Sequence, residues 1–172
     1  MISIWNSLPV PQRSVHDIFE VSPSELRSWG VKLLLMDLDN TLSPYSTDEA
    51  TQGLKAWIAA LKAAGIEPFL FSNNKGDRPE LFSRQLHVEY VKLAHKPKQE
   101  VLHQVLERKG VPKEQVCIIG DQIYTDILCA SIAGVKSIVV RPICLRNPLH
   151  ALRYLAEAPF RLAGRIKEAK RT

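Results

Sequence analysis

Residues 31–41 of this chain read VKLLLMDLDNT, an apolar run that changes abruptly into a polar one. The first six residues are apolar apart from one lysine, which is typical of a parallel strand buried on both faces. Asp37 and Asp39 follow directly, one residue apart. The segment therefore predicts a central strand that carries two carboxylates just beyond its carboxyl end.

The rest of the chain alternates between helix and strand patterns. Residues 48–64 repeat apolar side chains at helical spacing before Gly65, and Ser22 begins a capping box for a short helix that ends at Gly30. The expected strands are 31–36, 66–71, 88–93, 116–119 and 136–140, and the remaining helices are 77–86, 97–109 and 121–133. This alternation implies a Rossmann-like α/β domain, in which a mostly parallel sheet has helices on both faces.

Length and composition favour a single globular domain. The 172 residues are a usual domain length, and the hydrophobic fraction of 45% and charged fraction of 24% are ordinary. The sequence has no apolar run near the roughly 18 residues that a membrane span needs. Residues 1–10 lack the pattern of a secretory signal. We therefore expect a cytoplasmic protein.

Three polar clusters each follow an expected strand. They are Asp37 with Asp39, Ser72 with Asn73, and Asp121 with Asp126. In parallel sheets, ligands bind beyond the carboxyl ends of the strands, so the clusters should converge on one edge. Carboxylates that meet there repel one another unless a cation lies between them, and Mg²⁺ suits such oxygen ligands.

The chemistry of these side chains suits phosphate transfer. Asp37 would be the nucleophile, and Asp39 would act as general acid and then as general base. A transferred phosphate also needs donors for its oxygens. The candidates are Thr41, Ser72, Asn73 and Lys96, the last lying just before a helix expected to begin at Pro97.

Each cluster also has an ordinary structural explanation when it is taken alone. The Asp37 segment could cap a helix or form a polar turn, and Ser72 and its neighbours could be a plain loop. Lys96 could be a solvated side chain, and Asp121 could cap the helix after it. The order of the clusters and their shared edge favour the functional interpretation.

The motifs resemble those of the haloacid dehalogenase-like (HAD) superfamily over residues 31–140. The matching segments, in the order of that family, are DLDNT at 37–41, Ser72, Lys96 and GDQIYTD at 120–126. The resemblance implies a HAD fold and a phosphatase that forms a phosphoaspartate on its first aspartate.

The same resemblance implies a set of ligands for Mg²⁺. They would be the Asp37 carboxylate, the backbone carbonyl of Asp39 and the Asp121 carboxylate, with Asp126 ligating through water or orienting the shell. An acid at position 39 favours phosphatases over other members of the superfamily.

The layout is similar to subfamily IIIA, and within it to the mitochondrial-type phosphatidylglycerophosphatases and their bacterial relatives. Neither interval between the motifs has room for a large cap domain, so the site should be open. This resemblance implies conversion of phosphatidylglycerophosphate to phosphatidylglycerol. Two alternatives stay open: a phosphatase for a soluble nucleotide or sugar phosphate, and a non-catalytic module that binds RNA, ribosomes or membrane.

The net charge of +5 is concentrated in the C-terminal part of the chain. Residues 141–172 contain eight Lys and Arg and two acidic residues, whereas the rest contains 15 basic and 16 acidic residues. Beyond Pro148, apolar and basic side chains alternate at helical spacing, and such a segment can lie on an anionic membrane. The alternative is a terminal helix that packs on the domain with solvated charges.

These patterns divide the chain into three parts. We expect an N-terminal extension over residues 1–30 that packs on the core, a HAD-like phosphatase core over 31–147, and a basic amphipathic helical tail over 148–172. The tail would make the protein peripheral on the inner face of a membrane. No nucleic acid is expected as a partner, because the tail has few aromatic residues and no known motif.

Overall fold

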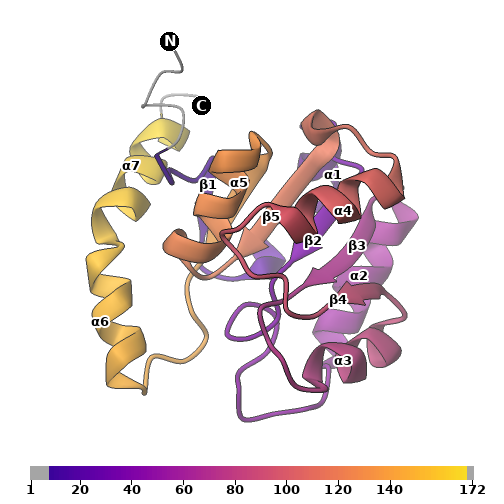
Figure 1. The fold of residues 1–172 in the computed structure, drawn as a ribbon, viewed down its shortest axis with the longest axis horizontal. Helices are drawn as coiled ribbons and strands as arrows, with labels where there is room; N and C mark the ends of the chain where they lie inside the picture. Colours follow the sequence, from indigo (N-terminus) through magenta and orange to yellow (C-terminus); the bar gives the residue numbers. More distant parts are fainter. Residues whose placement is uncertain (1–7, 170–172) are drawn as a thin grey trace.

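In the computed structural model, residues 8–169 are described, and six parallel strands within them form one sheet (Figure 1). The strands are β1 (Arg13–Val15), β2 (Leu33–Met36), β3 (Glu67–Phe71), β4 (Glu89–Val91), β5 (Val116–Gly120) and β6 (Lys136–Val140), in the order β1-β6-β5-β2-β3-β4. The expected α/β fold and its five strands are confirmed. The additional strand β1 lies at one edge, and three residues are too few to show a periodic pattern. The outer ends of the expected extension and tail, residues 1–7 and 170–172, lie outside the described residues.

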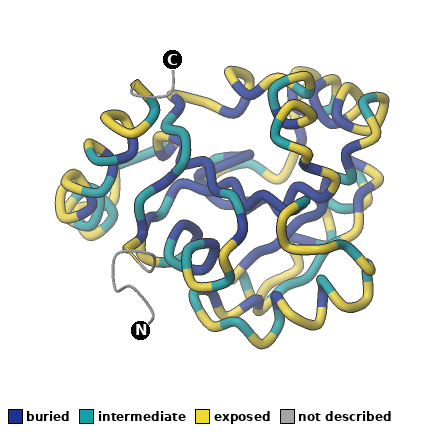
Figure 2. The backbone as a smooth tube through the Cα atoms, turned by 90° about the horizontal axis from the view of Figure 1, so that it is seen from above, coloured by how far each residue is buried: buried dark blue, intermediate teal, exposed yellow. Residues whose placement is uncertain are grey.

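Two helical layers cover the central strands, whose side chains alternate between the faces of the sheet. Leu34 and Met36 of β2 point to one face, and Leu33 and Leu35 to the other. The first face packs against α1 (Pro23–Ser28), α2 (Gln52–Ala63) and α3 (Arg78–Leu86), and the second against α4 (Glu100–Lys109) and α5 (Leu128–Ala133). Figure 2 shows the buried strands in the middle and the helices exposed on their outer sides.

Helix starts differ from the expected ones where the chain forms a turn first. The expected helix from Pro97 begins three residues later as α4, because the Lys98 amide donates to the His95 carbonyl (2.9 Å) in a turn. The helix expected over 121–133 opens with a π-helical turn, η4 (Ile123–Ile127), before α5. The Ser22 hydroxyl accepts from the Glu25 amide (3.1 Å), which is one half of the expected capping box, whereas the Glu25 side chain pairs with Arg13.

The C-terminal segment forms two helices, α6 (Pro148–Ala156) and α7 (Ala158–Ala169). Helix α7 packs along β1 at the sheet edge, and the Glu168 carboxylate accepts from the edge amide of Ser14 (3.3 Å). Gly164 permits this approach, because a Cβ there would lie 2.6 Å from Pro11. Among residues 8–169, no helix is both long and apolar enough to cross a membrane.

Candidate active site

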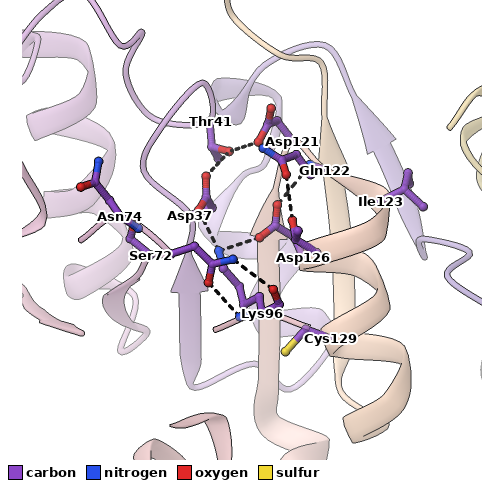
Figure 3. A network of polar contacts seen from close by, with 12 residues as sticks. Asp37, Thr41, Ser72, Asn74, Lys96, Asp121, Gln122, Ile123, Asp126 and Cys129 are labelled. Atoms are coloured by element: carbon purple, nitrogen blue, oxygen red, sulfur yellow. Dashed lines mark hydrogen bonds and ion pairs between the residues drawn. The ribbon is translucent and has the colours of Figure 1, made fainter. Parts of the chain in front are cut away.

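The polar clusters meet at the carboxyl ends of three adjacent strands (Figure 3). Asp37 follows β2, Ser72 follows β3 and Asp121 follows β5, and β2 lies between the other two strands. All three side chains are buried. A cavity of about 390 Å³ opens at this edge and is lined by Asp37, Asp39, Tyr45, Ser72, Asn73, Asn74, Lys75, Lys96, Gln122 and Thr125.

The backbone turns sharply after β2. The Asp37 amide donates to the Ile119 carbonyl (2.9 Å), which continues the ladder between β2 and β5, and Asn40 then takes a left-handed φ of 63°. Asparagine tolerates this conformation better than most residues. The turn brings back Thr41, whose hydroxyl donates to Asp37 (3.1 Å) and Asp121 (3.3 Å). The hydroxyl that we expected to bind phosphate thus contacts two carboxylates.

Lys96 is buried between two carboxylates. Its ammonium donates to Asp37 Oδ1 (2.7 Å) and Asp126 Oδ1 (2.6 Å), and its side chain is 1% exposed (Figure 3). Burial acts to lower the pKa of Lys96, but Asp126 and Asp37 outweigh burial and raise this pKa above its ordinary value. The ammonium therefore stays charged at neutral pH.

Asn73 fixes the backbone that carries this lysine. Its Nδ2 donates to the Lys96 carbonyl (3.0 Å) and its Oδ1 accepts from the Lys96 amide (2.8 Å). We expected this side-chain amide to bind phosphate. Both of its polar atoms contact the backbone, so Asn73 fixes the backbone of Lys96, while phosphate binding by Asn73 stays a prediction.

One ammonium faces three clustered carboxylates. Asp37, Asp121 and Asp126 each offer an oxygen within 4.8 Å of the others. Burial raises the pKa of Asp37 to about 6 against the lowering effect of Lys96, with Asp126 and Asp39 adding to the rise. Burial and then Asp37 raise the pKa of Asp121. The excess negative charge and the hard oxygen donors fit a divalent cation such as Mg²⁺.

Asp126 is held tightly within this cluster. One of its oxygens accepts from Lys96, and the other accepts from the Gln122 amide (3.1 Å). It packs on the end of β5, where a Cβ on Gly120 would lie only 2.3 Å from its carboxyl group. The orientation of Asp126 is therefore fixed, and Gly120 makes room for it.

Asp39 lies on the cavity wall with both oxygens engaged. Arg78 Nε donates to Oδ1 (2.8 Å) and Asn74 Nδ2 donates to Oδ2 (2.8 Å). Neither Arg78 nor Asn74 was predicted from the sequence. Asn74 adjoins the Ser72 cluster, which is a usable signal, whereas Arg78 is 39 residues from Asp39 in sequence and has no local signal.

Tyr45 is another cavity residue that was not predicted from the sequence. Burial, followed by the nearby Asp39, Asp121 and Asp37 carboxylates, raises its pKa to about 12. Its hydroxyl is therefore protonated at neutral pH. The centroid of its ring lies 5.7 Å from that of the His150 ring in α6, so the C-terminal helices reach the cavity wall.

The inner face of the C-terminal helices contacts the loop that carries Asp121. Arg161 donates to the carbonyls of Asp121 and Val140 (3.1 Å to the latter) and pairs with Glu157 (2.8 Å). Glu157 in turn accepts from the Ile123 amide (3.0 Å). Both charged side chains are buried. The tail thus supports the site by its inner face, in addition to its basic outer residues.

Comparison with known proteins finds relatives that are named as phosphatases. Residues 93–142 match the HAD-hydrolase-like family. The chain is 34% identical over 134 residues to the probable phosphatase YqeG of Bacillus subtilis (strain 168), covering 78% of each protein. It is 27% identical over 146 residues to the chloroplastic phosphatidylglycerophosphate phosphatase 1 of Chlamydomonas reinhardtii, covering 80% of this chain and 54% of that protein.

Solved structures share the fold at lower sequence identity. The 3-deoxy-D-manno-octulosonate 8-phosphate phosphatase of Yersinia pestis superposes with a TM-score of 0.50 at 16% identity, covering 83% of this chain and 86% of that one. A candidate HAD family hydrolase of Streptomyces avermitilis MA-4680 gives a TM-score of 0.54 at 19% identity, covering 73% and 79%. These likenesses support the fold.

The packing of Asp126 on Gly120 makes a stability prediction. Gly120→Ala should lower the free energy of unfolding by about 1–3 kcal/mol, because the new methyl group displaces a buried, paired carboxylate. Urea denaturation measures the change. Gly53→Ala in α2 is the control, since its Cβ meets nothing closer than 3.5 Å and should stabilise the protein by up to about 1 kcal/mol. Equal effects of the two substitutions would contradict this account of Gly120.

Proposed function

The chain belongs to the phosphatases of the haloacid dehalogenase-like superfamily, and from this we propose that Asp37 is the nucleophile of a magnesium-dependent phosphoric monoester hydrolase. One observation carries the proposal: the Asp37 carboxylate borders the cavity and is paired with a buried lysine at the meeting point of the strand ends. A phosphate in the cavity would face this carboxylate and the charge of Lys96.

In the first step, an Asp37 oxygen forms a bond to phosphorus while the bond from phosphorus to the leaving oxygen breaks. Asp39 donates its proton to that oxygen, which leaves as an alcohol. In the second step, Asp39 takes a proton from water, and the water oxygen attacks the phosphoaspartate. Inorganic phosphate leaves and the Asp37 carboxylate is restored. Lys96 stays charged and stabilises the negative oxygens of the phosphate.

HAD phosphatases generally use Mg²⁺. In this chain the Asp37 and Asp121 carboxylates and the Asp39 backbone carbonyl would hold the ion, and Asp126 would orient the set. When bound, the ion offsets the carboxylate charge and polarises the phosphate. Thr41 keeps Asp37 and Asp121 in their relative orientation through its shared hydrogen bonds.

Asp37→Asn should lower turnover of p-nitrophenyl phosphate at least about a thousandfold, because an amide is a poor nucleophile. An excess of chelator should have the same effect on the unaltered protein, reversed by added Mg²⁺. Release of p-nitrophenolate measures both, and circular dichroism reports the fold. Asp77→Asn, at an exposed carboxylate, is the matched control. Full activity of the Asp37 variant would refute the nucleophile assignment.

We further propose that the substrate is the lipid phosphatidylglycerophosphate. One relative carries that activity in its name and aligns over 80% of this chain. The segment between Thr41 and α2 is a loop, and that between Ser72 and Lys96 contains only α3 and β4, so neither of these two described segments forms a cap domain. An open site suits a phosphate that is anchored in a membrane.

The outer face of α6 and α7 supports a peripheral position on an anionic membrane. Its large apolar side chains are 50–68% exposed and are Leu149, Leu152, Leu155, Leu162 and Ile166. The charged side chains exposed beside them are the cations Arg146, Arg165 and Lys167. Two acidic residues lie in α6, α7 and the turn between them. These residues, Glu157 and Glu168, accept hydrogen bonds from backbone amides of the domain. A cationic surface with an apolar stripe matches the chemistry of anionic lipid.

A substrate panel tests the lipid assignment. The purified protein should release phosphate from phosphatidylglycerophosphate in mixed micelles at least about tenfold faster than from nucleotides or sugar phosphates, compared by kcat/KM. The reason is that the open site has no cap to enclose a small substrate. A clear preference for a soluble phosphate ester would assign the enzyme to metabolites instead.

Vesicle binding tests the outer face separately. Leu152→Gln with Leu155→Gln should weaken sedimentation with vesicles of equal parts phosphatidylcholine and phosphatidylglycerol at least about tenfold, because two apolar side chains lose their burial. Leu93→Gln with Ile132→Gln is the control, since these residues are also exposed but lie elsewhere. Equal binding of both double variants would rule out this face as the docking surface.

A further inference from the structure

Arg78, the first residue of α3, makes an unusually complete set of contacts beside the cavity. Its side chain is 12% exposed, and its guanidinium lies over the Phe82 ring at 5.0 Å. Four acceptors surround it: Asp39 Oδ1 (2.8 Å), the Pro44 carbonyl (2.9 Å), Asp48 Oδ1 (2.9 Å) and the Thr47 carbonyl. A side chain held this firmly can hold others in place.

The first of these acceptors is the proton donor of the proposed reaction. Arg78 Nε binds one oxygen of Asp39, and Asn74 binds the other. Asn74 is itself fixed, since its Oδ1 accepts from the Gly76 backbone amide (2.7 Å) and its backbone amide donates to the Ser72 hydroxyl (3.1 Å). The Asp39 carboxyl group is therefore set in one orientation at the cavity wall.

The two backbone acceptors belong to the loop that completes this wall. Pro44 and Thr47 flank Tyr45, which lines the cavity with Asp39. Their carbonyls bind the guanidinium nitrogens of Arg78, so one side chain joins the loop, α3 and the carboxyl group. Lysine offers a single ammonium and cannot reproduce this planar set of donors.

We propose that Arg78 is a positioning residue that holds the Asp39 carboxyl group where it delivers a proton to the leaving oxygen. The inference rests on the proposed phosphatase mechanism and adds to it a residue that does not touch the substrate. Its effect reaches the reaction through Asp39 and depends on how much the leaving group needs a proton.

Leaving-group chemistry separates this role from general support of the fold. An alkyl phosphate breaks its bond to phosphorus with difficulty unless the departing oxygen receives a proton, whereas p-nitrophenolate leaves readily without one. The value of kcat/KM depends on the steps from free enzyme and substrate up to the departure of the leaving group. Loss of a positioned acid should therefore lower kcat/KM for alkyl esters selectively, while disruption of the fold lowers kcat/KM for both ester types.

The experiment compares Arg78→Met, Arg78→Lys and the control Arg84→Met, which alters an exposed arginine on the same helix. The substrates are p-nitrophenyl phosphate and whichever alkyl phosphate the unaltered enzyme hydrolyses fastest. Arg78→Met should lower kcat/KM about 10- to 100-fold for the alkyl ester and less than about threefold for the aryl ester. Arg78→Lys should recover part of the alkyl activity, and Arg84→Met should change neither.

A double-mutant cycle shows whether the effect passes through Asp39. In an Asp39→Asn background, Arg78→Met should change alkyl kcat/KM less than about threefold. Equal losses on both esters, or an undiminished loss in that background, would overturn the positioning role. If Arg78→Met does not fold, Arg78→Lys replaces it in the comparison of kcat/KM for the two esters. Failure of the mechanism itself would be seen separately, as an active Asp37→Asn variant.

Discussion

A single buried ammonium between two carboxylates is the interaction on which this site depends. Unpaired charges are costly to bury, and Lys96 pairs with two carboxylates where Asp37, Asp121 and Asp126 crowd together. Neighbouring groups serve that arrangement: Asn73 fixes the lysine backbone, and the absence of a side chain at residue 120 leaves space for Asp126. Removal of the ammonium would leave Asp37 and Asp126 without the lysine that pairs with both of them. The loops that follow the strands at this site therefore depend on one buried positive charge.

The sequence predicts the sheet and the placement of its acidic residues well, because both follow from local patterns. Apolar runs that stop at polar residues mark β2, β3 and β5, and parallel strands bring their ends together. Helix starts were less accurate, as α4 shows, because the turn at His95 depends on backbone hydrogen bonds that no periodicity reveals. Strand β1 was missed for a related reason, since it exists through pairing with β6 across more than a hundred residues.

The remaining parts of the site depend on contacts between distant segments. Arg78 reads as an ordinary charged residue at a helix start, and only the folded chain brings it to Asp39. The contact of Asn73 with the Lys96 backbone was not predicted, because sequence shows that an amide is near a strand end but not which way it points. Glu157 and Arg161 resemble a surface pair one helical turn apart, yet both are buried against the Asp121 loop.

The packing of α7 along β1 also determines how copies of this protein can meet. An edge strand with free amides is a template on which another chain can pair, and proteins usually block such edges. Here a helix lies along the edge and the Glu168 carboxylate occupies the Ser14 amide. Helix α7 therefore blocks pairing of β1 with a strand of another molecule. Shortening the chain before α7 would open that edge, so aggregation of a truncated protein would report a bare strand rather than the loss of a membrane contact.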